Sequence, residues 1–492
     1  MKRSVCITLA TAILLSGCGR KAQTGEDGYT YRDYVTTMAT NWNPHTYETA
    51  SDAYPAQFIR SGLYSLIYND ELHPSNGKEP FTAYSVLPEM AASLPVDVTA
   101  AVRLEHPEFG IPEWADVGFA YAIDLNPNAV WEDGTPINAD TYVYSMKRLL
   151  DPTLLNYRAS DYYAGSFSIA GAEEYAKGEV GDDFSGVGLY KSGDYQITLV
   201  LDKSLGGFNL IYNLTSNFIV HEETYERCLK TEGGAAFSTY NTSADTTVSY
   251  GPYKLTSYQK DKAMSFEKNE RWYGHNDGKH VYTDPMSGEI LKMYQTTAVD
   301  TSVVAESATA KMMFLRGELS TYTLQTADFD AYKNSERAYA MPGETTFFLI
   351  LNGHKDAITR RESASTFDKN SFDIETVTLP DFRRAMAQSY ERELFAAVLS
   401  PARSGALGLI ADTYIYDPEN LLYYRDTDAA KQVLCDFYGV DTADFLSLDA
   451  AVSSIGGYDP KRARELFTSA FDAAIGAGYI TDKTATVSAT RR

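Results

Sequence analysis

The sequence lacks the closely spaced cysteine and histidine ligands from which zinc sites are built. Its seven histidines and four cysteines are scattered over 492 residues, and no two histidines stand four residues apart. No G-x-S-x-G element marks a serine nucleophile. The glycines at 476–478 follow an expected helix and fit a helix end better than a dinucleotide site. We therefore expect neither a metal nor a cofactor.

Basic residues are also in deficit. Against 66 acidic residues stand 43 lysines and arginines, which gives a net charge of −23. Such a charge repels phosphate backbones, so we expect no nucleic-acid partner.

The length of the chain exceeds what one hydrophobic core usually supports, which predicts two or three domains. The 37 tyrosines are best explained as half-buried sheet positions.

Long apolar runs are missing except at the N-terminus. Residues 5–15 are apolar, follow two basic residues and precede Leu-Ser-Gly-Cys, which ends at Cys18. This run is too short to span a bilayer and is typical of a secretory signal. The small residues before Cys18 resemble the lipobox of bacterial lipoproteins. We expect a signal peptide at 1–17, a lipid on Cys18, a tether at 18–27 and an extracytoplasmic, membrane-anchored protein.

Two cysteines remain once the leader and the lipidated residue are set aside. They are Cys228 and Cys435. An exported protein can hold them as a disulfide, but their separation in sequence carries no geometry. The sequence leaves their pairing open.

Hydrophobic periodicity predicts a mixed α/β chain. Period-2 alternation predicts strands at 29–35, 198–203, 251–259 and 262–269, and the continuous apolar run TFFLILN at 346–352 predicts a fully buried strand. Helices are expected at 55–63, 381–399 and 459–474, the last with Asp459 as N-cap. His275 and His280 fall in a polar loop, where we expect them to be solvated.

The stretch WEDGTPINADTYVYSMKRLLDP, residues 131–152, contains the only cluster of acidic residues in the sequence that suggests catalysis. A glycosidase would use two such carboxylates facing each other across a sugar. Turn and helix chemistry explains the stretch more simply. Asp133 and Gly134 suit a turn, Asn138 suits an N-cap, Asp140 suits a first helical turn, and Asp151-Pro152 stops the helix. We interpret these acids as scaffolding.

The same stretch resembles the signature of family 5 extracellular solute-binding proteins, the oligopeptide-binding components of ABC importers. The matching positions are Trp131, Asp133, Gly134, Pro136, Ala139, Tyr144, Ser145, Lys147, Arg148, Asp151 and Pro152. Three more segments are similar to family motifs: NPHTYETA, GPYKLTSYQKDKAMSFEKNERWYG and LPDFRRAMAQSYERELF, and YDPKRARELF is similar to a late family helix. Asp140 stands one place early, and Glu391 stands where the family favours Asp. The likeness runs from about Tyr29 to Tyr479.

This resemblance implies a two-lobed, periplasmic-binding-protein-like α/β fold with a hinge and an inserted subdomain. The implied parts are lobe I at 28–60 and 189–285, the inserted subdomain at 61–188, and lobe II at 286–492. Family members carry a further segment that completes lobe II after the YDPKRARELF-like helix. The chain ends soon after that helix, so we expect it to be truncated and lobe II to be incomplete.

The resemblance also implies a function. We expect a monomeric receptor that binds oligopeptides between its lobes and delivers them to an ABC permease, and not an enzyme. The implied ligand contacts are the backbone of Thr49, Ala50 and Ser51 and the side chains of Tyr162 and Tyr250. Nickel complexes, haem or oligosaccharides stay open as ligands. The alternative is an exported lipoprotein enzyme, such as a glycoside hydrolase that uses the acids near Trp131.

Overall fold

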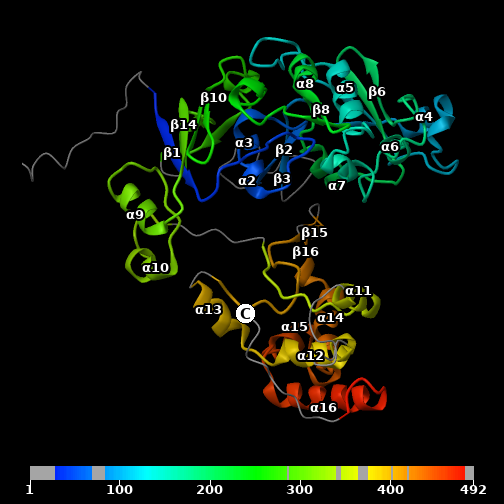
Figure 1. Ribbon diagram of the computed structural model, residues 1–492, viewed down its shortest axis with the longest axis vertical. Coiled ribbons are helices and arrows are strands. Elements are labelled where there is room, and N and C mark those ends of the chain that lie inside the picture. Colours follow the sequence, from blue (N-terminus) through cyan, green and yellow to red (C-terminus); the bar gives the residue numbers. More distant parts are fainter. Residues whose placement is uncertain are drawn as a thin grey trace, which may run out of the picture. The chain divides into compact units, whose positions relative to one another are not determined.

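The computed structural model describes residues 28–68, 84–284, 287–338, 345–363, 375–400, 403–417, 420 and 422–481. Cys18 lies outside these residues. The chain divides into two compact units, of which unit 1 ends at Tyr322 and unit 2 begins at Thr323. Each unit mixes helices with strands (Figure 1). No helix of the described ranges is long and apolar enough to cross a membrane.

Unit 1 contains a four-stranded sheet that joins the two ends of its sequence. In this sheet β1 (Thr30–Val35) runs parallel to β14 (Ala298–Val303), which pairs with β11 (Ala263–Lys268), and β11 pairs with β10 (Tyr253–Gln259). The predicted strands at 29–35, 251–259 and 262–269 are thereby confirmed. Because β1 pairs with β14, the residues between them form one long excursion from the sheet. The predicted start of lobe II, residue 286, precedes β14, although β14 pairs with β1 of the predicted lobe I.

A second four-stranded sheet lies within that excursion. Its order is β4 (Val96–Asp97), β5 (Ala120–Asp124), β7 (Gln196–Val200) and β6 (Leu189–Gly193), with antiparallel neighbours throughout. Three hairpins accompany the sheets: β2–β3 (Tyr64–Tyr68, Tyr84–Pro88), β8–β9 (Leu229–Glu232, Ala235–Ser238) and β12–β13 (Val281–Thr283, Ile290–Lys292). The strand predicted at 198–203 is β7, shifted by two or three residues.

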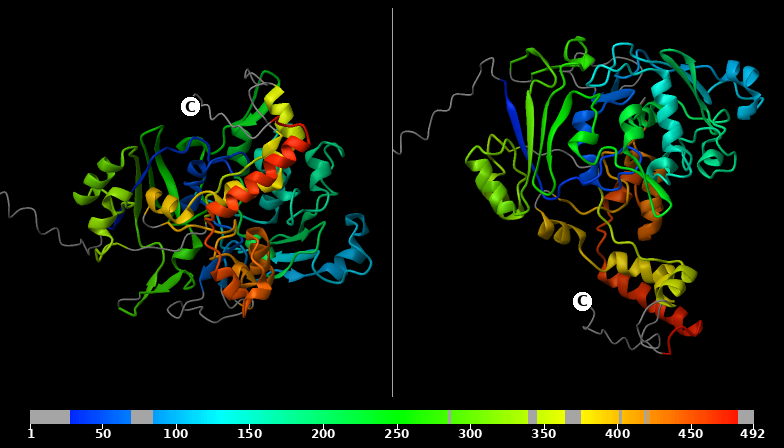
Figure 2. Two further views of the ribbon diagram at one scale, coloured as in Figure 1. Left: turned by 90° about the horizontal axis from the view of Figure 1, so that it is seen from below. Right: turned by 45° about the horizontal axis from the view of Figure 1, so that its top comes forward.

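The helices of unit 1 pack against both sheets and along the connections between them. They are α2 (Ala50–Ala53), α3 (Ala56–Ile59), α4 (Thr99–Glu105), α5 (Ala139–Leu149), α6 (Ala172–Ala176), α7 (Gly207–Leu214), α8 (Glu222–Cys228) and α9 (Ser307–Leu315). Helix α5 packs against β6 and β7 (Figure 2). Its buried side, together with β5 and β7, forms the largest hydrophobic cluster, which contains Trp131. A second cluster around Trp42 and Phe266 lies against the first sheet.

Unit 2 is mainly helical. Its elements are α10 (Thr326–Tyr332), α11 (Lys355–Ser363), α12 (Pro380–Gln388), α13 (Arg392–Leu399), α14 (Asp428–Tyr438), α15 (Leu448–Ser453), α16 (Pro460–Gly476) and the hairpin β15–β16 (Ile415–Asp417, Leu422–Tyr423). Helices α12 and α16 lie side by side (Figure 2). Asp459 caps α16 by accepting hydrogen bonds from two backbone N–H groups, as predicted. The helix predicted at 381–399 is divided into α12 and α13, because Glu391 is extended.

One strand prediction is wrong. The run at 346–352 forms neither a strand nor a helix, and Phe347, Phe348, Leu349 and Ile350 are between 54% and 82% exposed. A buried strand needs a neighbouring strand to pair with its backbone and an apolar layer on each face. The strands described in unit 2, β15 and β16, pair with each other and leave this run uncovered.

Candidate ligand-binding site

The predicted turn at the start of the 131–152 stretch is present. Trp131 is 1% exposed, and its ring makes edge contacts with Tyr250 at 4.8 Å and His221 at 5.2 Å between centroids. Asp133 accepts a hydrogen bond from the Thr135 backbone at 2.8 Å. Gly134 has φ +97°, a conformation that side-chain-bearing residues rarely adopt. The tryptophan is therefore part of the core, and Asp133 shapes the turn.

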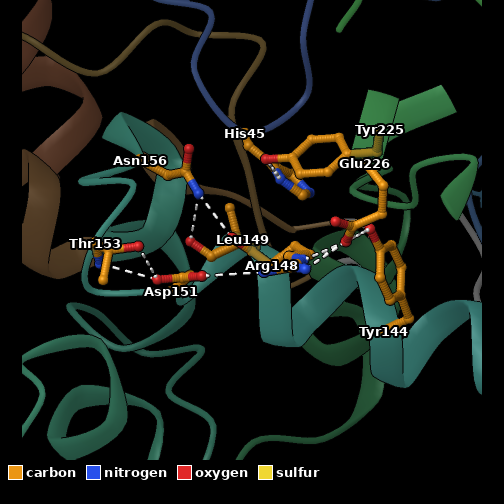
Figure 3. Close-up of polar contacts among 9 residues, drawn as sticks. All are labelled: His45, Tyr144, Arg148, Leu149, Asp151, Thr153, Asn156, Tyr225 and Glu226. Carbon is orange, nitrogen blue, oxygen red and sulfur yellow. Dashed lines mark hydrogen bonds and ion pairs between the residues drawn. The ribbon is translucent and has the colours of Figure 1, made fainter. Parts of the chain in front are cut away.

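The helix of this stretch is held at both ends. Asn138 and Thr141 form a reciprocal capping box at the N-terminus of α5. At the C-terminus, Glu226 of α8 accepts hydrogen bonds from the Tyr144 hydroxyl at 2.6 Å and from Arg148 Nε at 2.8 Å. Figure 3 shows this network. These contacts fasten α5 to α8 and confirm the scaffolding interpretation for this end.

Further contacts in Figure 3 close the turn after α5. Asp151 lies 3.3 Å from the Arg148 guanidinium and accepts a hydrogen bond from the Thr153 backbone at 2.9 Å. Asn156 donates from Nδ2 to the carbonyl oxygens of Arg148 at 2.8 Å and Leu149 at 3.0 Å. Two of the carbonyl groups left without partners at the helix end are thus satisfied by a side chain. Asp140 forms an exposed ion pair with Lys191 at 2.9 Å.

Glu132 is the exception to the scaffolding interpretation. Its backbone N–H donates to the Ser249 carbonyl at 2.8 Å, but its Oε2 is buried without a hydrogen-bond partner. Burial disfavours the charged carboxylate and raises the pKa of Glu132 to about 7. A carboxyl with this pKa holds its proton at mildly acidic pH.

Glu132 should make unit 1 less stable as the pH rises. The folded-state pKa is raised above the ordinary 4.5, so the folded state binds more protons between pH 4.5 and 7, and stability falls across this window. Glu132→Gln should match wild type at pH 5 and exceed it by about 2 kcal/mol at pH 8, after allowance for partial exposure. Chemical denaturation at the two pH values measures this. Asp140→Asn, at an exposed position, is the control, and equal effects of both variants would contradict the prediction.

The implied backbone contacts at 49–51 lie at the surface of unit 1. Thr49 is the N-cap of α2, and its Oγ1 donates to Asp52 at 2.7 Å. The same carboxylate accepts hydrogen bonds from the backbone of Thr40 at 2.8 Å and Asn41 at 3.1 Å. These bonds fix the turn on which exposed Ala50 and half-exposed Ser51 stand.

The two implied tyrosines lie in the core. Tyr162 is 8% exposed and packs against Phe218 at 5.4 Å between ring centroids. Tyr250 is 2% exposed, and its hydroxyl has no hydrogen-bond partner in the described structure. Burial raises the pKa of Tyr250, the Arg60 guanidinium opposes this, and the neighbouring Tyr240 and Tyr162 add to the rise. The structure thus brings Tyr162 and Tyr250 near each other, while 49–51 are exposed.

An apolar cavity of about 20 Å³ lies beside Tyr162. It is lined mainly by hydrophobic side chains, among them Tyr142, Met146 and Phe218. This volume is that of about one water molecule, so the cavity cannot hold a peptide side chain.

Arg60 is a polar residue of this region that the sequence does not single out. It follows α3 and is 7% exposed. Its guanidinium donates to the carbonyl oxygen of Trp42 and, at 3.4 Å, to Asn217 Oδ1. Arg60 falls within the helix expected at 55–63, and the apolar pattern of that helix gives no sign that a cation is buried there.

The expectation for the two loop histidines is wrong. His275 is 7% and His280 3% exposed. The His280 ring lies between two carboxylates, with Nε2 2.9 Å from Glu89 and Nδ1 2.8 Å from Asp277. Glu89 also accepts from the Tyr273 hydroxyl at 2.9 Å. The rings of Trp272, at 4.7 Å between centroids, and Tyr273 and Tyr294 pack against His280, and Glu89 comes to it from a distant part of the sequence. Within the described ranges, no group of three or more potential ligands could hold a metal.

The His280 contacts should stabilise the protein only while the ring is charged. Burial opposes the charge, but Glu89 and Asp277 outweigh it and raise the pKa of His280 above 6.5. A raised histidine pKa contributes stability below pH 6.5 that is lost as the pH rises through the folded-state pKa. We expect His280→Gln to cost about 2 kcal/mol at pH 6 and less at pH 9. Urea denaturation tests this, with the partly exposed His106→Gln as control; a pH-independent loss would contradict it.

Cys228 and Cys435, whose pairing the sequence left open, are both buried and free. Neither forms a disulfide in the structure.

Comparison with known proteins identifies relatives. The family model of bacterial extracellular solute-binding proteins, family 5 middle, matches residues 85–473. The dipeptide-binding protein of Lactococcus lactis subsp. cremoris is 24% identical over 48% of this chain and 38% of its own length. Dipeptide-binding protein DppE of Bacillus subtilis is 25% identical over 77% of this chain and 70% of its own length.

Solved structures share the fold. Listeria monocytogenes OppA bound to peptide has a TM-score of 0.57 at 16% identity, over 91% of this chain and 74% of that chain. The pheromone receptor PrgZ has a TM-score of 0.58 at 18% identity, over 85% of this chain and 69% of that chain. The predicted mixed α/β fold of periplasmic binding proteins is confirmed. The family match also confirms that the chain is a solute-binding protein and overturns the glycoside hydrolase alternative.

Proposed function

Because the chain belongs to the bacterial extracellular solute-binding proteins of family 5, we propose that it is a receptor that binds oligopeptides and delivers them to an ABC permease. The observation that carries the proposal is the family match over residues 85–473. Relatives whose names describe dipeptide and oligopeptide binding support the choice of ligand. We further propose that the receptor is monomeric and is held at the membrane by lipid on Cys18.

For the ligand contacts we propose the backbone of Thr49, Ala50 and Ser51, with Tyr162 and Tyr250 as the aromatic side of the site. Helix α2 supports this in part. The Asp52 N–H donates to the Thr49 hydroxyl at 3.1 Å, but the N–H groups of Ala50 and Ser51 have no partner within the helix and can donate to a peptide carbonyl. A peptide bound through its backbone is accepted with little regard to its sequence. The hydrogen bonds of Asp52 keep this turn in place before a ligand arrives.

The decisive experiment is a binding screen of the full-length chain. Mixed peptides are added, bound species are identified by native mass spectrometry, and thermal unfolding is followed in parallel. A bound peptide mass together with an increase in melting temperature is the expected result. Oligosaccharides, haem and nickel, tested separately, form the comparison. If no peptide mass appears and no stabilisation follows, the peptide proposal fails, and a response to one of the other ligands replaces it.

A backbone variant tests the contact at α2. Ala50 is the first helical residue, where proline is tolerated, and Thr49 before it is extended, as proline requires. Ala50→Pro therefore removes one N–H and leaves α2 in place. We expect a roughly three- to tenfold weaker peptide affinity, the value of one hydrogen bond. Glu222→Pro makes the same change at the first residue of α8, after the extended His221, and should leave affinity unchanged.

A further inference from the structure

Arg60 is a buried cation without a counter-ion. Its side chain donates only to neutral oxygens, those of Trp42 and Asn217, and to Asn241 Oδ1 at 2.9 Å once that amide is turned to satisfy both of its neighbours. Burial lowers the pKa of the Arg60 guanidinium, and the groups that oppose this are tyrosines, Tyr250 first. No carboxylate of the described residues forms an ion pair with it.

A buried charge is normally paired, because removal from water costs several kcal/mol for each ion. Arg148, although only partly buried, is paired with both Glu226 and Asp151. Neutral oxygens satisfy the hydrogen bonds of Arg60 but leave its charge uncompensated. The environment of Arg60 therefore favours an additional anion.

Two unused donors accompany this charge. The Tyr250 hydroxyl is buried without a partner, and so is Nδ2 of Asn43, a residue that is itself 0% exposed. Both are tied to the Arg60 region through the backbone. Tyr250 N–H donates to the Ile59 carbonyl at 2.9 Å, and Asn43 follows Trp42, whose carbonyl accepts from Arg60. Buried donors without acceptors in a native protein indicate a water or an ion.

The neighbouring histidine, His45, adds no charge to this region. His45 is 0% exposed and lies 2.9 Å from the Phe218 carbonyl and 3.2 Å from the Tyr225 hydroxyl. Burial lowers the pKa of His45 to about 3, the Phe218 carbonyl opposes this, and Arg60 adds to it. His45 is therefore neutral at physiological pH. A single buried water would satisfy the donors, but only an anion also compensates the charge of Arg60.

We propose that Arg60, Tyr250 and Asn43 form an anion site that takes a halide ion or a carboxylate. The guanidinium supplies charge and direction, and the hydroxyl and amide supply the additional donors. The carboxylate case rests on the proposed function, since the carboxylate would belong to a bound peptide. The halide case is independent of it, so the two failures can be distinguished.

Bromide is the probe for the site. Crystals of the full-length chain soaked in sodium bromide should show an anomalous peak within hydrogen-bonding distance of the Arg60 guanidinium and the Tyr250 hydroxyl. In solution, bromide should raise the melting temperature more than fluoride at equal ionic strength. Arg60→Met should weaken the bromide affinity behind this increase roughly tenfold or more, and Tyr250→Phe should weaken it roughly threefold. Arg462→Met, which removes an exposed arginine already paired with Glu465 at 3.1 Å, should have no effect.

The carboxylate arm uses peptides with a free or an amidated C-terminus. If Arg60 binds the carboxylate, amidation should weaken binding to the wild type and leave binding to Arg60→Met unchanged. Should Arg60→Met fail to fold, Tyr250→Phe keeps the ring and carries both tests. Bromide peaks at the surface only, together with equal affinity for both peptide forms, would overturn the proposal.

Discussion

Trp131→Ala should lower the free energy of unfolding by about 3–5 kcal/mol, the usual loss for a large aromatic removed from a core. Trp131 is 1% exposed, belongs to the largest hydrophobic cluster and makes edge contacts with Tyr250 and His221. Truncation removes these contacts and leaves a cavity, because the turn after Trp131 is fixed by Asp133 and Gly134 and cannot collapse inwards.

Denaturant unfolding of the two tryptophan variants measures the difference. Trp114 is 78% exposed, so Trp114→Ala is the matched control and should change stability by no more than about 0.5 kcal/mol. A loss below about 1 kcal/mol for Trp131→Ala would mean that the signature tryptophan is not part of the packing. Its place in the family motif would then need a functional reason.

Local signals were the reliable part of the sequence. The strands at 253–259 and 263–268 alternate with period 2 and pair with each other, so one hairpin contains all the information needed to predict it. The caps at Asn138 and Asp459 are equally local, since a side chain there bonds to N–H groups two or three residues later. Such features depend on few residues and are readable without knowledge of the fold.

Features that depend on distant partners were not predictable. The apolar run at 346–352 has the composition of a core strand, but composition does not supply the neighbouring strand that would cover it. His280 has a polar local sequence, but it is buried and paired with Glu89, a residue far away in the sequence. Arg60 has an apolar local sequence and is 7% exposed, without a carboxylate beside it among the described residues. In each case the environment is set by tertiary contacts that no local pattern contains.

The candidate site shows the same division. The turn at 49–51 was named from a family motif and is exposed, whereas Tyr162 and Tyr250 are buried among aromatic side chains. The unpartnered Tyr250 hydroxyl and the guanidinium of Arg60 become related only through the pairing of Tyr250 with Ile59. Their relation arises only in the folded chain, where both groups are buried without a compensating partner.

Cys18→Ser should release the protein from the membrane completely. Each buried methylene of an acyl chain contributes about 0.8 kcal/mol, and one chain alone binds only marginally, so stable anchoring requires at least two chains. Serine has no thiol to carry them. The net charge of −23 offers no electrostatic attraction to an anionic surface that could compensate. No helix in the described part of the chain could span the bilayer instead.

Fractionation of cells into membrane and soluble parts measures the effect. Cys6→Ser is the matched control, because Cys6 lies in the predicted leader and is removed with it, and this variant should stay with the membrane. Metabolic labelling with a fatty acid should mark the wild type and Cys6→Ser but not Cys18→Ser. If Cys18→Ser stays in the membrane fraction and still incorporates label, the lipid is attached elsewhere. If it stays without label, another part of the chain holds it there.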